Sequence, residues 1–217
     1  MRILILPFVA LATIATPAVA QDQRFPGFRV EANVGWDSAR GSLDYEDAAF
    51  PADNFTLKDH SNGALFGGTV GYDLPVGDGQ YVGIEASYDI ADNKRCEEVF
   101  GSDEACLSIK RNWSIGGRFG TRVARTVLFY VGGAYIDGRA RVSYEDQIDP
   151  TNNFSEAENR KGWQLSAGFE HRLVGNTFVT GEYRYNDYKN YKLTDGTESL
   201  SLGFSRHQVV AGVGMRF

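Results

Sequence analysis

Apolar and polar side chains alternate with a period of two over most of the chain. In the segment that ends the chain, one parity holds Val209, Ala211, Val213, Met215 and Phe217. The other parity of this segment carries Gln208, Arg216 and glycines. Such alternation is typical of a β-strand with one apolar and one polar face. An exposed apolar edge would be an aggregation hazard in water, which lipid contact and closure into a barrel would remove.

The same period predicts eight strands, which run approximately over residues 26–36, 63–74, 81–90, 107–121, 127–143, 162–173, 178–186 and 204–217. Each is about the 9 to 11 residues, or more, that a tilted membrane strand needs. Short connections at 75–80, 122–126 and 174–177 alternate with long ones at 37–62, 91–106, 144–161 and 187–203. This alternation predicts an all-β fold, an eight-stranded antiparallel up-and-down transmembrane β-barrel with long extracellular loops and short periplasmic turns.

Aromatic residues of the apolar parity fall at two heights along the predicted strands. Near the long loops are Trp36, Tyr88, Trp113, Tyr144, Trp163 and Tyr185, and near the short turns are Tyr72, Phe119, Tyr130, Phe169 and Phe217. Two such girdles mark the two interfaces of a membrane. They argue against a water-soluble β-sandwich.

The first twenty residues have the pattern of a secretory signal peptide. A charged start at Arg2 precedes an apolar run over residues 3–15, and Ala18-Val19-Ala20 forms a small-residue cleavage site. No later stretch reaches the roughly 18 consecutive apolar residues of a spanning helix. We therefore predict a signal peptide at 1–20 and one outer-membrane β-barrel domain at 21–217.

Charged residues occupy the parity opposite the apolar one. The predicted inward set consists of Arg29, Glu31, Asp73, Glu85, Asp89, Lys110, Arg118, Asp137, Arg139, Arg141, Glu170, Arg172, Glu182, Arg184, Arg206 and Arg216. A charge that faces lipid at mid-depth costs about 2–4 kcal/mol, so these charges should face the lumen and pair there. Residues 127–136 are apolar throughout, and the register of that strand is therefore taken from Asp137, Arg139 and Arg141.

A charged lumen has two interpretations, a selective ion path or a plug of paired side chains. The interior of an eight-stranded barrel is just wide enough for side chains to fill, which favours the plug. Inward glycines would then make room for long Arg and Glu side chains rather than bind phosphate.

Several short segments carry a family resemblance. Glu182-Tyr183-Arg184-Tyr185, Tyr130-Val131-Gly132-Gly133, Gly71-Tyr72 and the terminal Phe217 resemble the small outer-membrane β-barrel family of opacity-type, porin-family and OmpA-like surface proteins. The resemblance implies location in the cell outer membrane. It also implies insertion by the outer-membrane assembly machinery, which in this family reads the last strand and its final Phe. Haemin binding occurs among such proteins, but no His or Cys cluster here supports it.

The acidic residues gather in the predicted loops. The four long loops hold 19 acidic and 8 basic residues, within a chain of net charge −6. Acidity of this kind argues against nucleic acid as a partner. Asp44-Tyr45-Glu46-Asp47 and residues 145–149 could bind divalent cations, but neither matches a defined calcium loop, and a solvated acidic surface is the favoured interpretation. The expected partners are outer-membrane lipid, lipopolysaccharide and a host or cell-surface ligand.

Cys96 and Cys106 are the two cysteines of the chain and lie in one predicted outer loop. In an exported protein such a pair most simply forms a disulfide, which for so short a loop stabilises by about 2–3 kcal/mol. We weigh this pairing above a redox or metal role.

Catalysis finds little support in the sequence. Lipid A deacylases and palmitoyl transferases are small barrels that use His and Ser near the lipid face. This chain has three histidines, His60, His171 and His207, and no G-x-S-x-G elbow. We predict a non-enzymatic surface protein without cofactor, in which a closed, salt-bridged barrel anchors acidic extracellular loops for envelope integrity or adhesion. The alternative is a narrow porin-like channel for small solutes.

Overall fold

The computed structural model describes residues 25–50, 52, 54–99, 103–145, 153–196 and 198–217. The predicted signal peptide at 1–20 lies outside the described residues. In the part of the chain that is described, no helix is long and apolar enough to cross a membrane.

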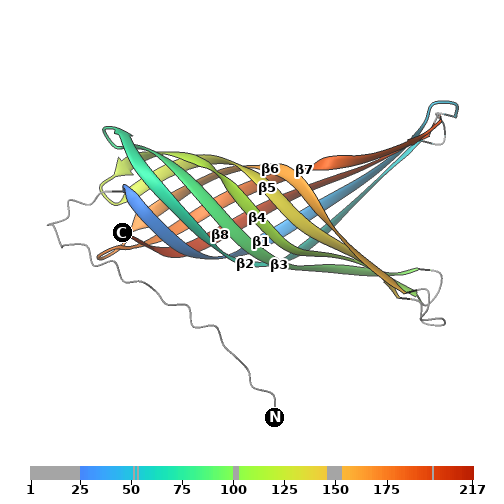
Figure 1. Ribbon diagram of the computed structural model, residues 1–217, viewed down its shortest axis with the longest axis horizontal. Helices are drawn as coiled ribbons and strands as arrows, with labels where there is room; N and C mark the ends of the chain where they lie inside the picture. The colour runs from blue at the N-terminus through green and yellow to red at the C-terminus, as the bar shows by residue number, and fades with distance from the viewer. Residues whose placement is uncertain (1–24, 51, 53, 100–102, 146–152, 197) are drawn as a thin grey trace, which may run out of the picture.

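Eight strands form one closed antiparallel barrel in sequence order, with β1 paired to β8 (Figure 1). The strands are β1 (Gly27–Asp47), β2 (Phe55–Gly77), β3 (Gln80–Val99), β4 (Asp103–Ala124), β5 (Val127–Glu145), β6 (Phe154–Arg172), β7 (Thr177–Asp195) and β8 (Glu198–Arg216). The predicted eight-stranded up-and-down barrel is confirmed. Closure pairs every strand on both sides, which satisfies the backbone groups that lipid cannot hydrogen-bond.

Tight turns join the strands at one end of the barrel. Between β2 and β3, Gly79 has φ of 74°, and its carbonyl accepts a hydrogen bond of 2.7 Å from the Arg122 amide of β4. Glycine adopts this left-handed conformation without the steric cost that a side chain would add. The start of β1 and the end of β8 lie at the same end, because Arg29 pairs with Arg216.

The strands extend far beyond their predicted ends on the side opposite the tight turns, which is taken as the upper side of the barrel. They contain 19 to 23 residues each, whereas about 9 to 11 suffice to cross a bilayer. Pairing of β1 with β2 continues to Tyr45 and Phe55, and pairing of β7 with β8 continues to Asp195 and Glu198. The prediction of long loops in these regions is wrong, because most of each segment continues the hydrogen-bonded ladder.

Above the barrel the wall divides into two four-stranded arms. Pairing between β2 and β3 ends at Leu65 and Ala91, and pairing between β6 and β7 ends at Gly162 and Tyr188. The first arm consists of the upper parts of β1, β2, β7 and β8, and the second arm of the upper parts of β3, β4, β5 and β6. Figure 1 shows the two arms diverging from the end of the barrel opposite the tight turns.

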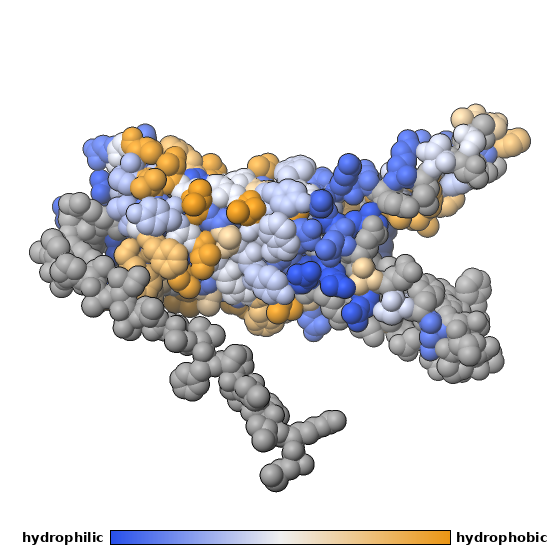
Figure 2. Space-filling model, in the orientation of Figure 1, coloured by the Kyte–Doolittle hydropathy of each residue, from blue (hydrophilic) through white to orange (hydrophobic). Residues whose placement is uncertain are grey.

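The two faces of the wall differ as the period-two pattern predicts. On β1, Arg29 and Glu31 are buried inside, whereas Val30 and Val34 are exposed outside. The other strands of the barrel likewise expose large apolar side chains, and Figure 2 shows apolar atoms over the barrel and hydrophilic atoms where the arms begin. The outer face therefore suits the hydrocarbon of a membrane.

The register predicted for the fifth strand is wrong. Leu128, Tyr130 and Ile136 of β5 are buried inside, while Arg139 and Arg141 are exposed and share the outer parity. Asp137 and these two arginines therefore leave the lumen set, and Tyr130 leaves the aromatic girdle. The reason is that the upper part of β5 rises above the hydrocarbon of the membrane, where charge is tolerated on either face and no longer identifies the lumen.

The two cysteines are direct cross-strand partners. Cys96 of β3 lies opposite Cys106 of β4 in the second arm, and the described residues include no free cysteine. Directly opposed residues of antiparallel strands have Cα atoms about 4.5–5.5 Å apart, which a disulfide can bridge. The register places the two residues where a disulfide can form, and the bond itself stays a prediction.

We predict that protein purified without reductant resists a thiol-reactive polyethylene glycol under denaturing conditions. After reduction both cysteines should react, because the bond that protects them is broken, and a gel should show the shift of two labels. The Cys96→Ser variant is the control and should take one label with or without reductant. Labelling of the unreduced parent chain would contradict the disulfide.

Candidate functional site, the barrel lumen

An apolar floor closes the lumen at the end with the tight turns. Phe25, Tyr81 and Leu128 form a buried cluster, with the rings of Phe25 and Tyr81 5.8 Å apart. The guanidinium of Arg172 lies 5.8 Å from the centre of the Phe25 ring, and Arg216 donates a hydrogen bond to the Phe25 carbonyl. The segment before β1 is thereby tied into the lumen.

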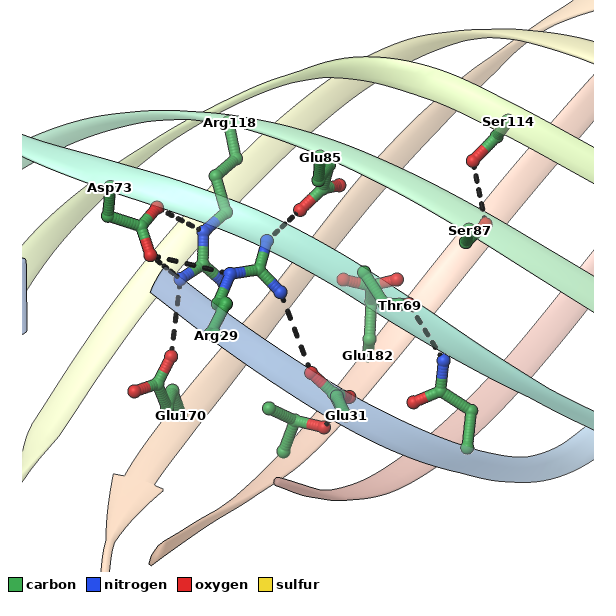
Figure 3. Close-up of polar contacts among 12 residues, drawn as sticks. Arg29, Glu31, Thr69, Asp73, Glu85, Ser87, Ser114, Arg118, Glu170 and Glu182 are labelled. Atoms are coloured by element: carbon green, nitrogen blue, oxygen red, sulfur yellow. Dashed lines mark hydrogen bonds and ion pairs between the residues drawn. The ribbon is translucent and has the colours of Figure 1, made fainter. Parts of the chain in front are cut away.

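Above the floor lies a network of buried ions, the lower ion network, composed of Arg29, Glu31, Asp73, Glu85, Arg118, Glu170 and Arg216. Figure 3 shows the members other than Arg216. Arg118 donates two hydrogen bonds to Asp73, of 2.9 and 2.7 Å, and a third to Glu170 at 3.2 Å. Bidentate contacts of this kind are among the strongest that a guanidinium makes.

Arg216 and Arg29 complete the lower ion network. Arg216 donates two hydrogen bonds of 2.7 Å to Glu170, and its Nη2 lies 2.8 Å from Asp73. Arg29 pairs with Asp73 at 3.4 Å, with Glu31 at 3.6 Å and with Glu85. The members come from β1, β2, β3, β4, β6 and β8, so the lower ion network connects six strands across the bore.

A glycine makes room for one of these guanidinium groups. A Cβ atom at Gly71 would lie 2.8 Å from Nη2 of Arg29, closer than real Cβ contacts allow. The inward glycine therefore lets the Arg29 side chain lie flat against β2. This agrees with the packing role that the sequence predicts for inward glycines.

A second set of charges lies higher in the lumen. Arg184 of β7 pairs with Asp89 of β3 at 3.1 Å and with Glu182 on its own strand. Between this set and the lower ion network, the Arg118 guanidinium lies 4.7 Å from the centre of the buried Tyr130 ring. Cation–π contact of this kind, away from water, adds to the stability of the packed bore.

The top of the lumen holds an ion pair that the sequence did not predict. Arg206 donates three hydrogen bonds of 2.6 to 3.1 Å to Asp37, which is fully buried and also accepts one of 3.0 Å from Gln208. Tyr188 donates to Asn112 at 3.1 Å in the same layer. Asp37 was missed because it was assigned to a loop, although it continues the inward parity of Arg29 and Glu31.

The structure thus separates the predicted site residues into groups. Arg29, Glu31, Glu85, Arg118 and Glu170 meet in the lower ion network, and Asp89, Glu182 and Arg184 meet above it. Arg172 lies apart at the floor, and Arg139 and Arg141 are exposed on the outer face. Asp137 shares their parity but is buried. Lys110 falls at a register shift between Ile109 and Arg111, and its side chain lies outside the described residues.

Phe217 lies on the outer face beside the start of β1. Its amide donates a hydrogen bond of 2.8 Å to the Phe28 carbonyl, and the two rings are 6.2 Å apart. The side chain is exposed, where lipid would contact it. Its role in assembly stays a prediction.

Some buried polar atoms of the lumen have no partner among the described residues. They include side-chain atoms of Asn33, Asp89, Asn112, Gln164, Ser166 and Asn186. These six lie in the middle and upper lumen, where buried atoms of this kind are commonly satisfied by water. In the lower ion network, the Nε of Arg29 also has no hydrogen-bond partner among the described residues, although it lies 3.4 Å from Asp73. The lower lumen is thus filled by ion pairs and aromatic rings, whereas the upper lumen offers positions for water.

Among the described residues no group of three or more His, Cys, Asp and Glu side chains could hold a metal ion. His207 instead lies on the outer face, where its Nδ1 is 2.5 Å from the Tyr183 hydroxyl and its ring 5.1 Å from that of Tyr185. His60 is exposed on the first arm.

Two solved structures are similar to this chain. The neisserial surface protein A structure matches with a TM-score of 0.51 at 14% identity, over 88% of this chain and 97% of that one. The attachment invasion locus protein Ail of Yersinia pestis matches with a TM-score of 0.45 at 14% identity, over 89% and 100% of the two chains. The likeness to neisserial surface protein A concerns the fold.

Sequence comparison identifies the family. A 22 kDa outer membrane protein of Rhizobium leguminosarum bv. viciae is 32% identical over 108 residues, which are 49% of this chain and 46% of that protein. The match therefore spans about half the length of that relative. The family model described as outer membrane protein beta-barrel domain matches residues 6–217. The chain is an outer-membrane protein and belongs to the outer membrane protein beta-barrel domain family.

Proposed function

We propose that this protein is a closed, non-enzymatic anchor in the outer membrane that carries two arms at the cell surface, for envelope integrity or adhesion. The lower ion network carries this proposal. It joins six strands across the bore with buried side chains, and the apolar floor of Phe25, Tyr81 and Leu128 lies beneath it. Side chains are enough to fill the bore of a barrel of this size.

The arms support a role in contacts outside the cell. They continue the ladders of the barrel, so a partner would meet shaped sheets rather than free loops. On the first arm, Asp44, Glu46 and Asp59 carry acidic groups at positions that are partly or fully open to solvent. Acidic sheets of this kind suit cationic partners or bridging by divalent cations between the arm and neighbouring anionic lipid.

The surroundings of the histidines support a protein without catalytic activity. The Nδ1 of His207 contacts the Tyr183 hydroxyl, and its ring lies tilted against that of Tyr185, on a face that lipid covers. This arrangement is typical of an interfacial aromatic cluster. His60 and His171 lie on other strands, with His171 paired to Val127 and Val179 in the ladder.

A narrow channel for small solutes is the second candidate. The observation that favours it is the set of unpartnered polar atoms in the upper lumen, which includes Asn33, Gln164 and Asn186. Water at these positions would begin a wet path, but the path would have to pass Arg29, Arg118 and Arg216 and the apolar floor. The anchor is therefore the better supported function.

We predict that Arg118→Leu destabilises the barrel by about 3–5 kcal/mol, because it leaves the buried carboxylates of Asp73 and Glu170 with one cation fewer. Urea unfolding of the protein in phospholipid vesicles would measure this loss. Arg122→Leu on the same strand is the matched control. Its ion pair with Asp78 is exposed to solvent, so the unfolding midpoint should stay unchanged. Equal effects of the two variants would contradict the proposed role of the lower ion network.

We also predict that shortening the first arm leaves assembly intact and abolishes surface contacts. Residues 43–57 and 193–200 would each be replaced by an Asn-Gly turn, which suits a two-residue hairpin. A Gram-negative host that expresses the variant should contain barrels of unchanged heat-modifiable mobility but show reduced adhesion to polystyrene or increased sensitivity to detergent. The two readouts separate adhesion from envelope integrity.

The control for this experiment keeps the shape of the arm and removes charge, through Asp44→Asn, Glu46→Gln and Asp59→Asn. If the arm acts through its acidic surface, the control should show the same reduced adhesion or increased detergent sensitivity as the shortened variant. A role of the first arm would be contradicted if the shortened variant is present in normal amounts as folded protein and its adhesion and detergent sensitivity are both unchanged.

A further inference from the structure

Four cationic side chains gather on the outer face of β4, β5 and β6, where the second arm leaves the barrel. This basic patch consists of Arg111, Arg139, Arg141 and Lys161. Arg139, Arg141 and Lys161 are exposed, and Arg111 is half-buried. The patch stands out because the chain as a whole is acidic, with a net charge of −6.

Strand pairing brings these cations together. Arg111 of β4 lies directly opposite Arg139 of β5, and Lys161 of β6 lies opposite Asp137 of β5. Directly opposed like charges destabilise a pair of strands. Among the residues that the structure describes, no carboxylate forms an ion pair with Arg111 or Arg139. An anion from outside the chain would relieve this repulsion.

The acidic neighbours of the patch leave it positive. Asp137 lies between Trp113 and Lys161 in the ladder and is mostly buried. Asp187 of β7 pairs with Trp163 and accepts a hydrogen bond of 3.3 Å from the Tyr185 hydroxyl. Asp92 of β3 is exposed and lies at the bulge beside Arg111. Among the described side chains, four cations therefore face three carboxylates, one of which is already engaged by a tyrosine.

The aromatic girdle fixes the height of the patch in the membrane. Trp113, Tyr135 and Trp163 share the outer face, with the rings of Trp113 and Tyr135 5.6 Å apart. Arg111 is two residues above Trp113 and Lys161 is two residues above Trp163, which at roughly 3.3 Å per residue is about 7 Å along the strand. Arg139 and Arg141 lie four and six residues above Tyr135, roughly 13 and 20 Å along β5. Because Trp and Tyr girdles mark the membrane interface, the patch extends outward from the depth of the outer-leaflet headgroups.

An apolar groove lies on the same outer face below the girdle. Its lining includes Phe119, Val131, Ala167, Phe169, Gly181 and Tyr183, and it extends from β4 across β8 to β1. Small residues at Ala167 and Gly181 alternate there with the larger side chains of Phe169 and Tyr183. The groove lies towards the tight turns from Trp163, at the depth of acyl chains.

We propose that the basic patch binds the phosphate groups of a phosphorylated glycolipid of the outer leaflet, of the lipopolysaccharide type, with an acyl chain in the groove beneath. Arginine recognises phosphate through paired hydrogen bonds, and the opposed Arg111 and Arg139 present two guanidinium groups to one anion. The aromatic girdle and the groove favour a lipid over free phosphate. This site is separate from the lumen and from the first arm.

The experiment titrates diphosphoryl lipid A into the refolded chain in a neutral detergent. The fluorescence of Trp113 and Trp163, which border the patch, reports binding. The variant Arg111→Gln/Arg139→Gln removes the opposed pair, and Arg40→Gln/Lys58→Gln on the first arm removes the same charge elsewhere as the matched control. Dephosphorylated lipid A and inorganic phosphate are the other two probes.

We expect the patch variant to bind diphosphoryl lipid A at least tenfold more weakly than the parent chain, and the control to bind as the parent does. Dephosphorylated lipid A should bind the parent chain more weakly than diphosphoryl lipid A, by a similar factor. Equal affinity of the patch variant and the parent would overturn the proposal, as would equal binding of the two lipids. Displacement of the lipid by an equal concentration of inorganic phosphate would assign the site to free phosphate instead of a lipid.

A second variant keeps the proposal testable if the Arg111→Gln/Arg139→Gln variant does not fold. Arg141→Gln/Lys161→Gln removes the other half of the basic patch and should also weaken binding of diphosphoryl lipid A, by several-fold. Salt gives an independent measure on the parent chain, since exposed charges are screened at about 10 Å in 0.1 M salt. Affinity that does not fall as salt rises would contradict recognition through phosphate.

Discussion

The constraint on which this structure depends is the narrow bore of a closed eight-stranded wall. The outer face must be apolar for lipid, so the polar half of each strand is turned into a space that only side chains can fill. A buried guanidinium in such a space costs several kcal/mol unless carboxylates surround it. Asp73 meets this requirement for three arginines at once, since Arg29, Arg118 and Arg216 all contact it. The lower ion network is therefore both the filling of the barrel and a tie between its strands.

Above the hydrocarbon of the membrane this constraint is released, and the architecture changes with it. The ladder continues without acyl chains outside or a packed lumen inside, and the wall opens where β2 leaves β3 and β6 leaves β7. Charge on the outer face is then permitted, as Arg139 and Lys161 demonstrate. The same surface can carry acidic arms at the top and a basic patch at the headgroup level, each suited to a different partner.

The sequence predicts most of the membrane part, because lipid imposes a strict alternation there. Arg29, Glu85, Arg118 and Glu170 were placed in the lumen by parity alone, and the structure brings them into contact. Prediction was wrong for Arg139 and Arg141, since residues 127–136 lack polar positions and the register was taken from charges above the membrane. It also missed Asp37, because nothing in the sequence marks where pairing stops. Which carboxylate meets which arginine depends on the shear of the barrel, which parity does not reveal.

The central claim is that side chains close the bore, and single-channel recording of the refolded protein in a planar bilayer tests it most directly. Folding would be confirmed on the same sample by heat-modifiable mobility on a gel. The account predicts no stable openings, because the lower ion network and the floor around Phe25 block the lumen. Stable openings of reproducible conductance would contradict a closed bore and would make the narrow channel the better supported function.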